Sequence, residues 1–163
     1  MFEAKECTEI VDITEDIIVV GVSLQKSGLP ITFDSLGKMW ELFGNSYRGQ
    51  NKIANAINPK QEYAVLLNKV PDYIAGHAVL YANEVADDCS SVIIPKGKYI
   101  KDTFNAESFE ELADKVLPKR KVKAWAKKNN VKVDGQFSVE VYPWEEFDNG
   151  NFEMYTLTPI KEK

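Results

Sequence analysis

The sequence predicts an α+β fold in which duplicated βαββ units pair about a pseudo-twofold axis into one antiparallel sheet with flanking helices. Three observations support this prediction. Short β-branched and aromatic segments have the composition of strands, and segments with apolar residues at helical spacing separate them. The order strand, helix, strand, strand occurs twice with similar spacing. No linker composition divides the halves, so we expect one domain over residues 17–163, preceded by an extension over residues 1–16.

The first unit opens with the apolar run IIVVGV at residues 17–22, which is typical of a buried strand. A helix is expected next, capped by Thr32 or Asp34 and ended by Gly44. Its apolar positions, which recur at helical spacing, are Leu36, Met39, Trp40 and Phe43. The pattern predicts a further helical turn at residues 52–57.

Two strands complete the first unit. Residues 63–68 (YAVLLN) and 73–81 (YIAGHAVLY) are rich in β-branched and aromatic side chains. The short link between them contains Pro71 and Asp72, which are turn-forming residues. The two segments therefore predict a hairpin.

The second unit repeats this order. A strand over residues 91–103 is interrupted by Pro95-Lys96-Gly97, which predicts a bulge or a bend. Ser108 is expected to cap a helix. Pro118 is expected to kink or break that helix, because proline lacks an amide hydrogen and its ring clashes with the preceding turn.

Two more strands are expected at the C-terminal end of the second unit. They cover residues 137–142 (FSVEVY) and 152–157 (FEMYTL), and the turn sequence DNGN at residues 148–151 joins them. Alternation in the first of these strands separates an apolar set, which we expect to pack on the helices, from a polar set on the other face. The apolar set is Phe137, Val139 and Val141.

The charge of the chain limits its partners. The formal net charge of −5 argues against nucleic-acid binding, because the phosphate backbone requires a basic surface. One basic cluster, over residues 119–128, falls in a predicted helix, and we interpret it as a solvated face. No apolar run approaches the ~20 residues that span a bilayer, and the acidic N-terminus lacks the basic start of a secretory signal. We therefore expect a cytoplasmic protein with no nucleic-acid or membrane partner.

Cysteine and histidine are scarce. Cys7 and Cys89 have no motif spacing, and we interpret both as free thiols. His77 is the single histidine of the sequence and is interpreted as structural or surface-exposed. The usual zinc and haem ligand sets cannot be assembled from these residues, so we expect no metal and no cofactor.

Several stretches together resemble GyrI-like proteins. They are GLPITFDSLGKMWELFGN (28–45), YAVLLN followed by DYIAGHAV, IPKGKYI (94–100) and VEVYPWEEFDNGNFEMYTLTPI (139–160). This fold is shared by the effector-binding domains of AraC-type and MerR-type multidrug transcription activators. The resemblance implies a central ligand cavity between the two halves, which holds a bulky, aromatic and often cationic small molecule. Regulatory members carry a helix-turn-helix segment before the domain, for which sixteen residues leave no room, so we expect a stand-alone domain.

The resemblance also implies which residues line the cavity. Glu140 and Tyr142 alternate onto one face of their strand, and Glu153 and Tyr155 share one face of the next. In the multidrug activators, acidic and aromatic residues at matching positions line the drug cavity, so we expect these four residues to bind the ligand, with both carboxylates in one cavity. Tyrosine rings add cation–π attraction to such a site. Trp40 is expected either to fill the core or to line the cavity wall.

Two other functions remain open at this point. Some GyrI-like relatives hydrolyse electrophilic, cyclopropane-containing genotoxins, and the resemblance makes Glu140, Glu153 and Tyr155 the candidate catalytic residues of such a metal-independent hydrolase. Other members inhibit DNA gyrase, and a broad acidic surface that mimics nucleic acid would suit that role. The leading hypothesis is a small-molecule binding module.

Overall fold

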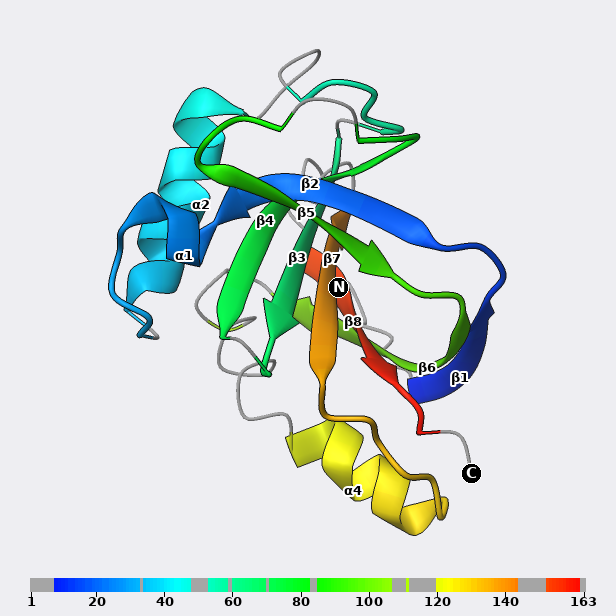
Figure 1. Cartoon of the computed structure of the whole chain (residues 1–163). Helices are drawn as coiled ribbons and strands as arrows, with labels where there is room; N and C mark the ends of the chain where they lie inside the picture. Colours follow the sequence, from blue (N-terminus) through cyan, green and yellow to red (C-terminus); the bar gives the residue numbers. More distant parts are fainter. Residues whose placement is uncertain are drawn as a thin grey trace.

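The computed structural model describes residues 8–32, 34–47, 53–58, 60–69, 71–82, 85–106, 111, 120–143 and 152–161. These residues form eight antiparallel strands in one sheet, with the order β1-β6-β8-β7-β3-β4-β2-β5 (Figure 1). The strands are β1 (Thr8–Ile13), β2 (Ile17–Ser23), β3 (Gln61–Leu67), β4 (Asp72–Val79), β5 (Cys89–Ile94), β6 (Gly97–Ala106), β7 (Phe137–Pro143) and β8 (Phe152–Pro159). The helices are α1 (Leu24–Ser27), α2 (Ser35–Ser46) and α4 (Arg120–Lys128). The predicted α+β class is confirmed.

The strand order is symmetric about its centre. β3 and β7 lie side by side in the middle, and β4 with β8, β2 with β6 and β5 with β1 follow in matching positions towards the edges. Matching strands at the centre and at the edges also have equal lengths. This arrangement is the predicted pseudo-twofold pairing of two βαββ units.

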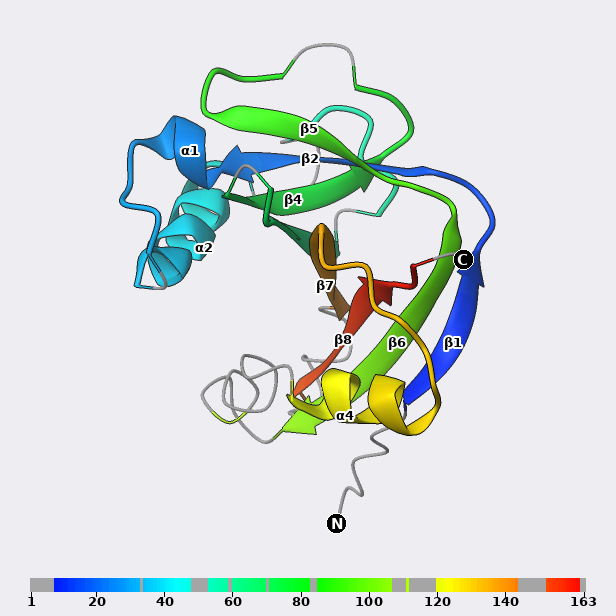
Figure 2. The same cartoon turned by 60° about the horizontal axis from the view of Figure 1, so that its bottom comes forward.

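Each half lends one strand to the other. β1 precedes β2 in the chain but pairs with β6, and β5 precedes β6 but pairs with β2. Both connections curve around the same side of the molecule (Figure 2). The interruption predicted at residues 95–97 is therefore a corner that sends β5 and β6 to different ends of the sheet, and Gly97 allows it with a φ of 151°.

Some predicted boundaries differ from the structure. Residues 8–13, which the sequence assigns to the N-terminal extension, form strand β1. This strand lies at the sheet edge, and Glu9, Ile10 and Asp12 are exposed. Helix α2 continues past Gly44 to Ser46. Residues 53–57 form turns and an isolated bridge rather than a helical turn, and residue 52 is not described. The expected helix break at Pro118 and the turn at residues 148–151 lie outside the described residues.

The two faces of the sheet carry separate cores. α2 and α4 lie on the same face, α2 against Ala64 and Ala75, and α4 against Ile100. The opposite face is buried by the sheet itself, because side chains of β2, β5, β6 and the central strands pack together there. The prediction that Phe137, Val139 and Val141 pack on the helices is therefore wrong: they belong to the helix-free core. Both faces are buried, so an apolar alternation cannot show which face the helices cover.

The β2–β4 ladder has no room for side chains at one pair. Gly21 and Gly76 are direct partners. A Cβ atom on Gly76 would lie 1.9 Å from the carbonyl oxygen of Val20, and one on Gly21 would lie 2.1 Å from that of Ala75. These contacts are with backbone, so neither clash can be relieved by rotating a side chain.

Gly76→Ala should lower the free energy of unfolding by more than about 3 kcal/mol, because the paired backbones of β2 and β4 would have to separate. The measurement is urea denaturation, and Gly37→Ala is the matched control. Gly37 is exposed within α2 with open space around its Cα, so alanine there should add about 0.5–1 kcal/mol. Equal effects of the two substitutions would contradict the close strand approach.

Candidate functional site

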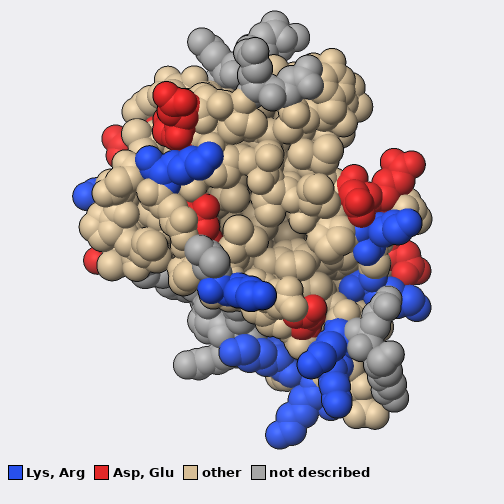
Figure 3. Space-filling view, in the orientation of Figure 1, with Lys and Arg blue, Asp and Glu red and all other residues tan. Residues whose placement is uncertain are grey.

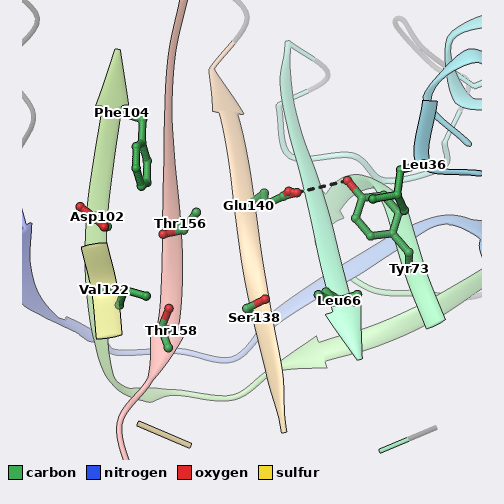
Figure 4. A pocket seen from close by; sticks show the side chains of 10 residues that line it. All are labelled: Leu36, Leu66, Tyr73, Asp102, Phe104, Val122, Ser138, Glu140, Thr156 and Thr158. Atoms are coloured by element: carbon green, nitrogen blue, oxygen red, sulfur yellow. Dashed lines mark hydrogen bonds between the residues drawn. The ribbon is translucent and has the colours of Figure 1, made fainter. Parts of the chain in front are cut away.

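A pocket opens on the helix-covered face between α2 and α4. Its cavity volume is about 70 Å³, and it is partly open to solvent. α2 contributes Leu36 and α4 contributes Val122, while the floor comes from five neighbouring strands (Figure 4). The strand residues are Leu66, Tyr73, Asp102, Phe104, Ser138, Glu140, Thr156 and Thr158.

One row of paired residues crosses all eight strands and passes through this floor. In spatial order the row is Thr8, Asp102, Thr156, Glu140, Ala64, Ala75, Val22 and Cys89. The pseudo-twofold axis passes between Ala64 and Glu140, so each residue in one half has a counterpart in the other. The first-half residues are small or apolar and are covered by α2, whereas their second-half counterparts are polar. In the second half this row therefore places hydrogen-bonding groups on the pocket floor. In the first half the matching residues are packed under α2.

Glu140 lies at the end of the polar half of this row, next to the aromatic residues of the first half. The Tyr73 hydroxyl donates to Glu140 Oε1 over 3.3 Å, and the Tyr142 hydroxyl donates to Oε2 over 3.2 Å. Trp40 Nε1–H in turn donates to the Tyr73 hydroxyl oxygen over 2.9 Å. The carboxylate is thus held in place from both sides.

Three aromatic rings surround this carboxylate. The Trp40 ring makes edge contacts with Tyr142, at 5.2 Å between centroids, and with Tyr73, at 6.4 Å. Trp40 comes from α2, Tyr73 from β4 and Tyr142 from β7, so three elements far apart in sequence build the wall. A carboxylate beside several π faces is an arrangement that attracts a delocalised cation.

Burial changes the acidity of the two tyrosines. Loss of solvent raises the pKa of Tyr73 and of Tyr142 well above the ordinary value of 10.0, and the negative charge of Glu140 raises both further. Both hydroxyls therefore stay protonated and act as donors to the carboxylate.

The structure separates the two predicted Glu–Tyr pairs. Glu140 pairs with Thr156, and Val141 pairs with Tyr155, so Glu153 and Tyr155 lie on the opposite face from Glu140. Tyr155 packs against the helix-free core, with Lys101 Nζ 4.4 Å from its ring centre. The expectation that Glu140 and Glu153 share one cavity is corrected by this register. Tyr142 and Trp40 lie beside Glu140 on the helix-covered face, but of these three residues it is Glu140 that lines the pocket, while Trp40 and Tyr142 pack against the core under α2.

His77 and Cys89, two other residues considered in the sequence analysis, are buried in the protein. His77 is fully buried, with Nδ1 2.9 Å from the carbonyl oxygen of Gln61 and its ring in edge contact with Phe43. Cys89 is a buried free thiol, and burial raises its pKa to about 11, which makes it a poor nucleophile. Cys7 lies outside the described residues. Within the described ranges, no group of histidine, cysteine or carboxylate side chains is arranged to hold a metal ion.

Sequence reasoning missed several residues of the pocket. Tyr73, Asp102 and Thr156 carried no motif, and only the strand register brings them beside Glu140.

Charge is unevenly distributed over the surface, because lysines gather over α4 at the lower end of the molecule (Figure 3). Lys123, Lys127 and Lys128 are exposed, in agreement with the predicted solvated face. Among the described helices, none is long and apolar enough to cross a membrane.

Comparisons with known proteins place the chain among effector-binding proteins. A family model described as integron-associated effector binding protein (Cass2) matches residues 13–156. The structure is similar to the integron cassette protein VCH_CASS2 of Vibrio cholerae, with 15% identity, a TM-score of 0.55, and coverage of 94% of this chain and 95% of that one. No curated protein matches the chain significantly.

Two other solved structures share the fold. SAV2435, solved bound to tetraphenylphosphonium, has 10% identity and a TM-score of 0.58, with 94% of this chain and 93% of that chain covered. The C-terminal domain of EcmrR has 12% identity and a TM-score of 0.66, with 99% and 100% covered. At sequence identities of 10% and 12%, the similarity shows a shared fold.

Alkaline titration should report the buried tyrosines. The folded pKa of Tyr73 and Tyr142 is raised above the unfolded value, so their contribution to stability is present below about pH 10 and is lost as the pH rises further. We expect the free energy of unfolding to fall above this pH, and less steeply in Tyr142→Phe. Tyrosinate absorbance in the folded protein should rise at higher pH than in the urea-unfolded chain. Coinciding titration curves would show that the hydroxyls are not shielded.

Proposed function

The chain belongs to the family of integron-associated effector-binding proteins, and we propose that it binds a bulky aromatic cation in the pocket between α2 and α4. The observation that carries this proposal is the Glu140 carboxylate, held by two tyrosine hydroxyls within an aromatic wall. SAV2435, which shares the fold, is described as bound to tetraphenylphosphonium, and this supports a cationic ligand. The cellular role we propose is that of a cytoplasmic receptor that senses or sequesters such a compound.

Different interactions are expected to provide the affinity and the charge selectivity of this complex. Burial of the ligand's rings against Leu36, Leu66 and Val122 supplies most of the affinity. The Tyr73 ring, which lines the pocket, adds cation–π attraction of about 0.5–2 kcal/mol. Glu140 selects the charge, because a neutral ligand would remove water from the carboxylate without compensating it.

Binding fits the geometry better than hydrolysis. A general base needs a free oxygen within hydrogen-bond reach of the attacking water. Each oxygen of Glu140 already accepts one hydrogen bond from a tyrosine, which stabilises the charged carboxylate over its protonated form. Glu153 and Tyr155, the other catalytic candidates, lie on the opposite face of the sheet. We therefore propose a receptor rather than a hydrolase.

Glu140→Gln should weaken tetraphenylphosphonium binding at least tenfold, because removing the charge partner of a buried cation costs on the order of 2–5 kcal/mol. Calorimetry or dye displacement measures the dissociation constant, which we expect to be micromolar for the wild type. The matched control is Glu153→Gln, which removes the same charge from the other face and should change affinity less than twofold.

Neutral triphenylphosphine oxide completes this test. It presents similar rings without a positive charge, so its affinity should not fall in Glu140→Gln. Equal losses for the cation and the neutral compound would mean that Glu140 does not read charge, and the proposed selectivity would have to be abandoned.

Trp40 should report ligand binding by fluorescence. Its indole contacts both Tyr73 and Tyr142, so a cation beside Glu140 lies close enough to quench it. We expect tetraphenylphosphonium to quench the wild type, and Trp40→Phe to remove most of that change while Trp125 still emits. Trp125, which packs beside the small α4 core, serves as the control through Trp125→Phe. Quenching retained in Trp40→Phe but lost in Trp125→Phe would place the ligand beside Trp125 and away from Glu140.

A further inference from the structure

We propose that β5, at the edge of the sheet, pairs antiparallel with β5 of a second copy of this chain. β5 lies at one end of the strand order and β1 at the other (Figure 2). A strand at a sheet edge directs N–H and C=O groups outward, where they can pair with another chain. β5 contributes no residue to the pocket lining, so this inference does not depend on the proposed function.

The β2–β5 ladder shows which backbone groups of β5 point outward. The amide of Ser23 donates to the carbonyl oxygen of Asp88 over 3.0 Å, so these two residues form a hydrogen-bonded pair. Because such pairs alternate along an antiparallel ladder, the even-numbered residues of β5 bond to β2. Ser91 and Ile93 therefore direct their N–H and C=O groups away from β2. No other residue in the described part of the chain bonds to these groups.

The outward groups at both ends of β5 are already used. The Cys89 amide donates to the carbonyl oxygen of Ala86 over 2.9 Å, and Lys26 Nζ donates to the Cys89 carbonyl oxygen over 2.6 Å. At the other end, Pro95 has no amide hydrogen, and its carbonyl oxygen accepts a hydrogen bond from the Tyr99 hydroxyl. The two outward-facing residues between these ends remain available for pairing.

One symmetric register uses all of the available groups. If Ser91 of each copy lies opposite Ile93 of the other, both residues donate and accept across the new ladder. Val92 then lies opposite Val92 of the second copy, and Cys89 lies opposite Pro95. This last match is complementary, because the residue that lacks an amide hydrogen meets the residue whose backbone groups are already bonded.

Charges at the ends of β5 favour the antiparallel orientation and a second copy as the partner. Asp87 and Asp88 precede the strand and Lys96 follows it, and both Asp87 and Lys96 are exposed. Antiparallel pairing places the acidic end of each copy beside the basic end of the other. Parallel pairing would place like charges together, which destabilises a ladder.

The two edges of the sheet differ in protection. β5 has no charged side chain from Cys89 to Ile94, and Ile93 is 58% exposed. β1 carries the exposed Glu9 and Asp12, and charged side chains on an edge strand oppose pairing. After β5 pairs with β5, both outer edges of the joined sheet are β1 strands. The assembly therefore closes as a twofold dimer and does not grow into a fibre.

Sedimentation velocity over a range of protein concentrations measures this association. We expect the wild type to dimerise, and Ile93→Lys to lower the association constant about tenfold or more, because each copy then brings a positive charge into the new ladder. Ile10→Lys is the matched control, since it makes the same substitution on β1 at a side chain that is 46% exposed, and it should leave the dimer intact. Thermal melting of each variant shows whether it is folded.

A disulfide tests the register. Val92→Cys should cross-link two copies on oxidation, because non-hydrogen-bonded partners in an antiparallel ladder have Cα atoms about 4.5 Å apart, within the range of a disulfide. Ser91→Cys is the control, because the same residue of the second copy lies diagonally across the ladder, about 7–8 Å away. Mass spectrometry of the digested protein identifies which residues are joined.

Three sedimentation results would overturn the inference: a wild type that stays monomeric at every concentration, a dimer that survives Ile93→Lys, or a dimer that Ile10→Lys dissociates equally well. Cross-linking of Ser91→Cys as efficient as that of Val92→Cys would exclude the register, and with it the pairing of the free backbone groups.

Discussion

The pairing of β3 with β7 is the constraint on which the rest of the structure depends. Seven residue pairs join the two halves into one sheet. The register places Ala64 opposite Glu140 and Glu62 opposite Tyr142, so it decides which side chains face the helices. A slip by one residue would turn the side chains of a whole half to the other face. The pocket, the aromatic wall and the two buried cores all follow from this one ladder.

The two halves share a topology, but the first half is closely packed and the second half carries the polar pocket floor. The first half packs α2 closely against small side chains such as Ala64 and Ala75. In the second half, the described part of α4 contributes Val122 and Ala126 to a much smaller buried cluster with Ile100. Polar groups on a protein floor reduce packing and cost stability, which proteins commonly accept at functional sites. The close packing of the first half offsets the stability that the polar pocket floor costs in the second half.

Periodicity in the sequence was enough to predict most of the fold and part of the site. The strands around Val19 and Val65 and the helix containing Met39 and Phe43 have clear patterns. The face of β8 could not be assigned, because Glu153 and Tyr155 on one side and Met154 and Thr156 on the other are both mixtures of polar and apolar residues. β1 was missed because an edge strand has few buried positions. Tyr73 and Asp102 enter the site through register, which no local pattern encodes.

The exchange of β1 and β5 has a consequence for the history of the chain. Neither half completes its own sheet, because the strand that precedes β2 pairs with β6 and the strand that precedes β6 pairs with β2. A gene for a single βαββ unit with its leading strand would therefore encode an incomplete protein, and two copies would complete each other by swapping that strand. Fusion of two such genes would turn a symmetric homodimer into one chain and free each half to mutate separately. In a pair of identical units these two positions would carry the same residue, whereas Ala64 and Glu140 differ, so the symmetry is broken at the centre of the molecule.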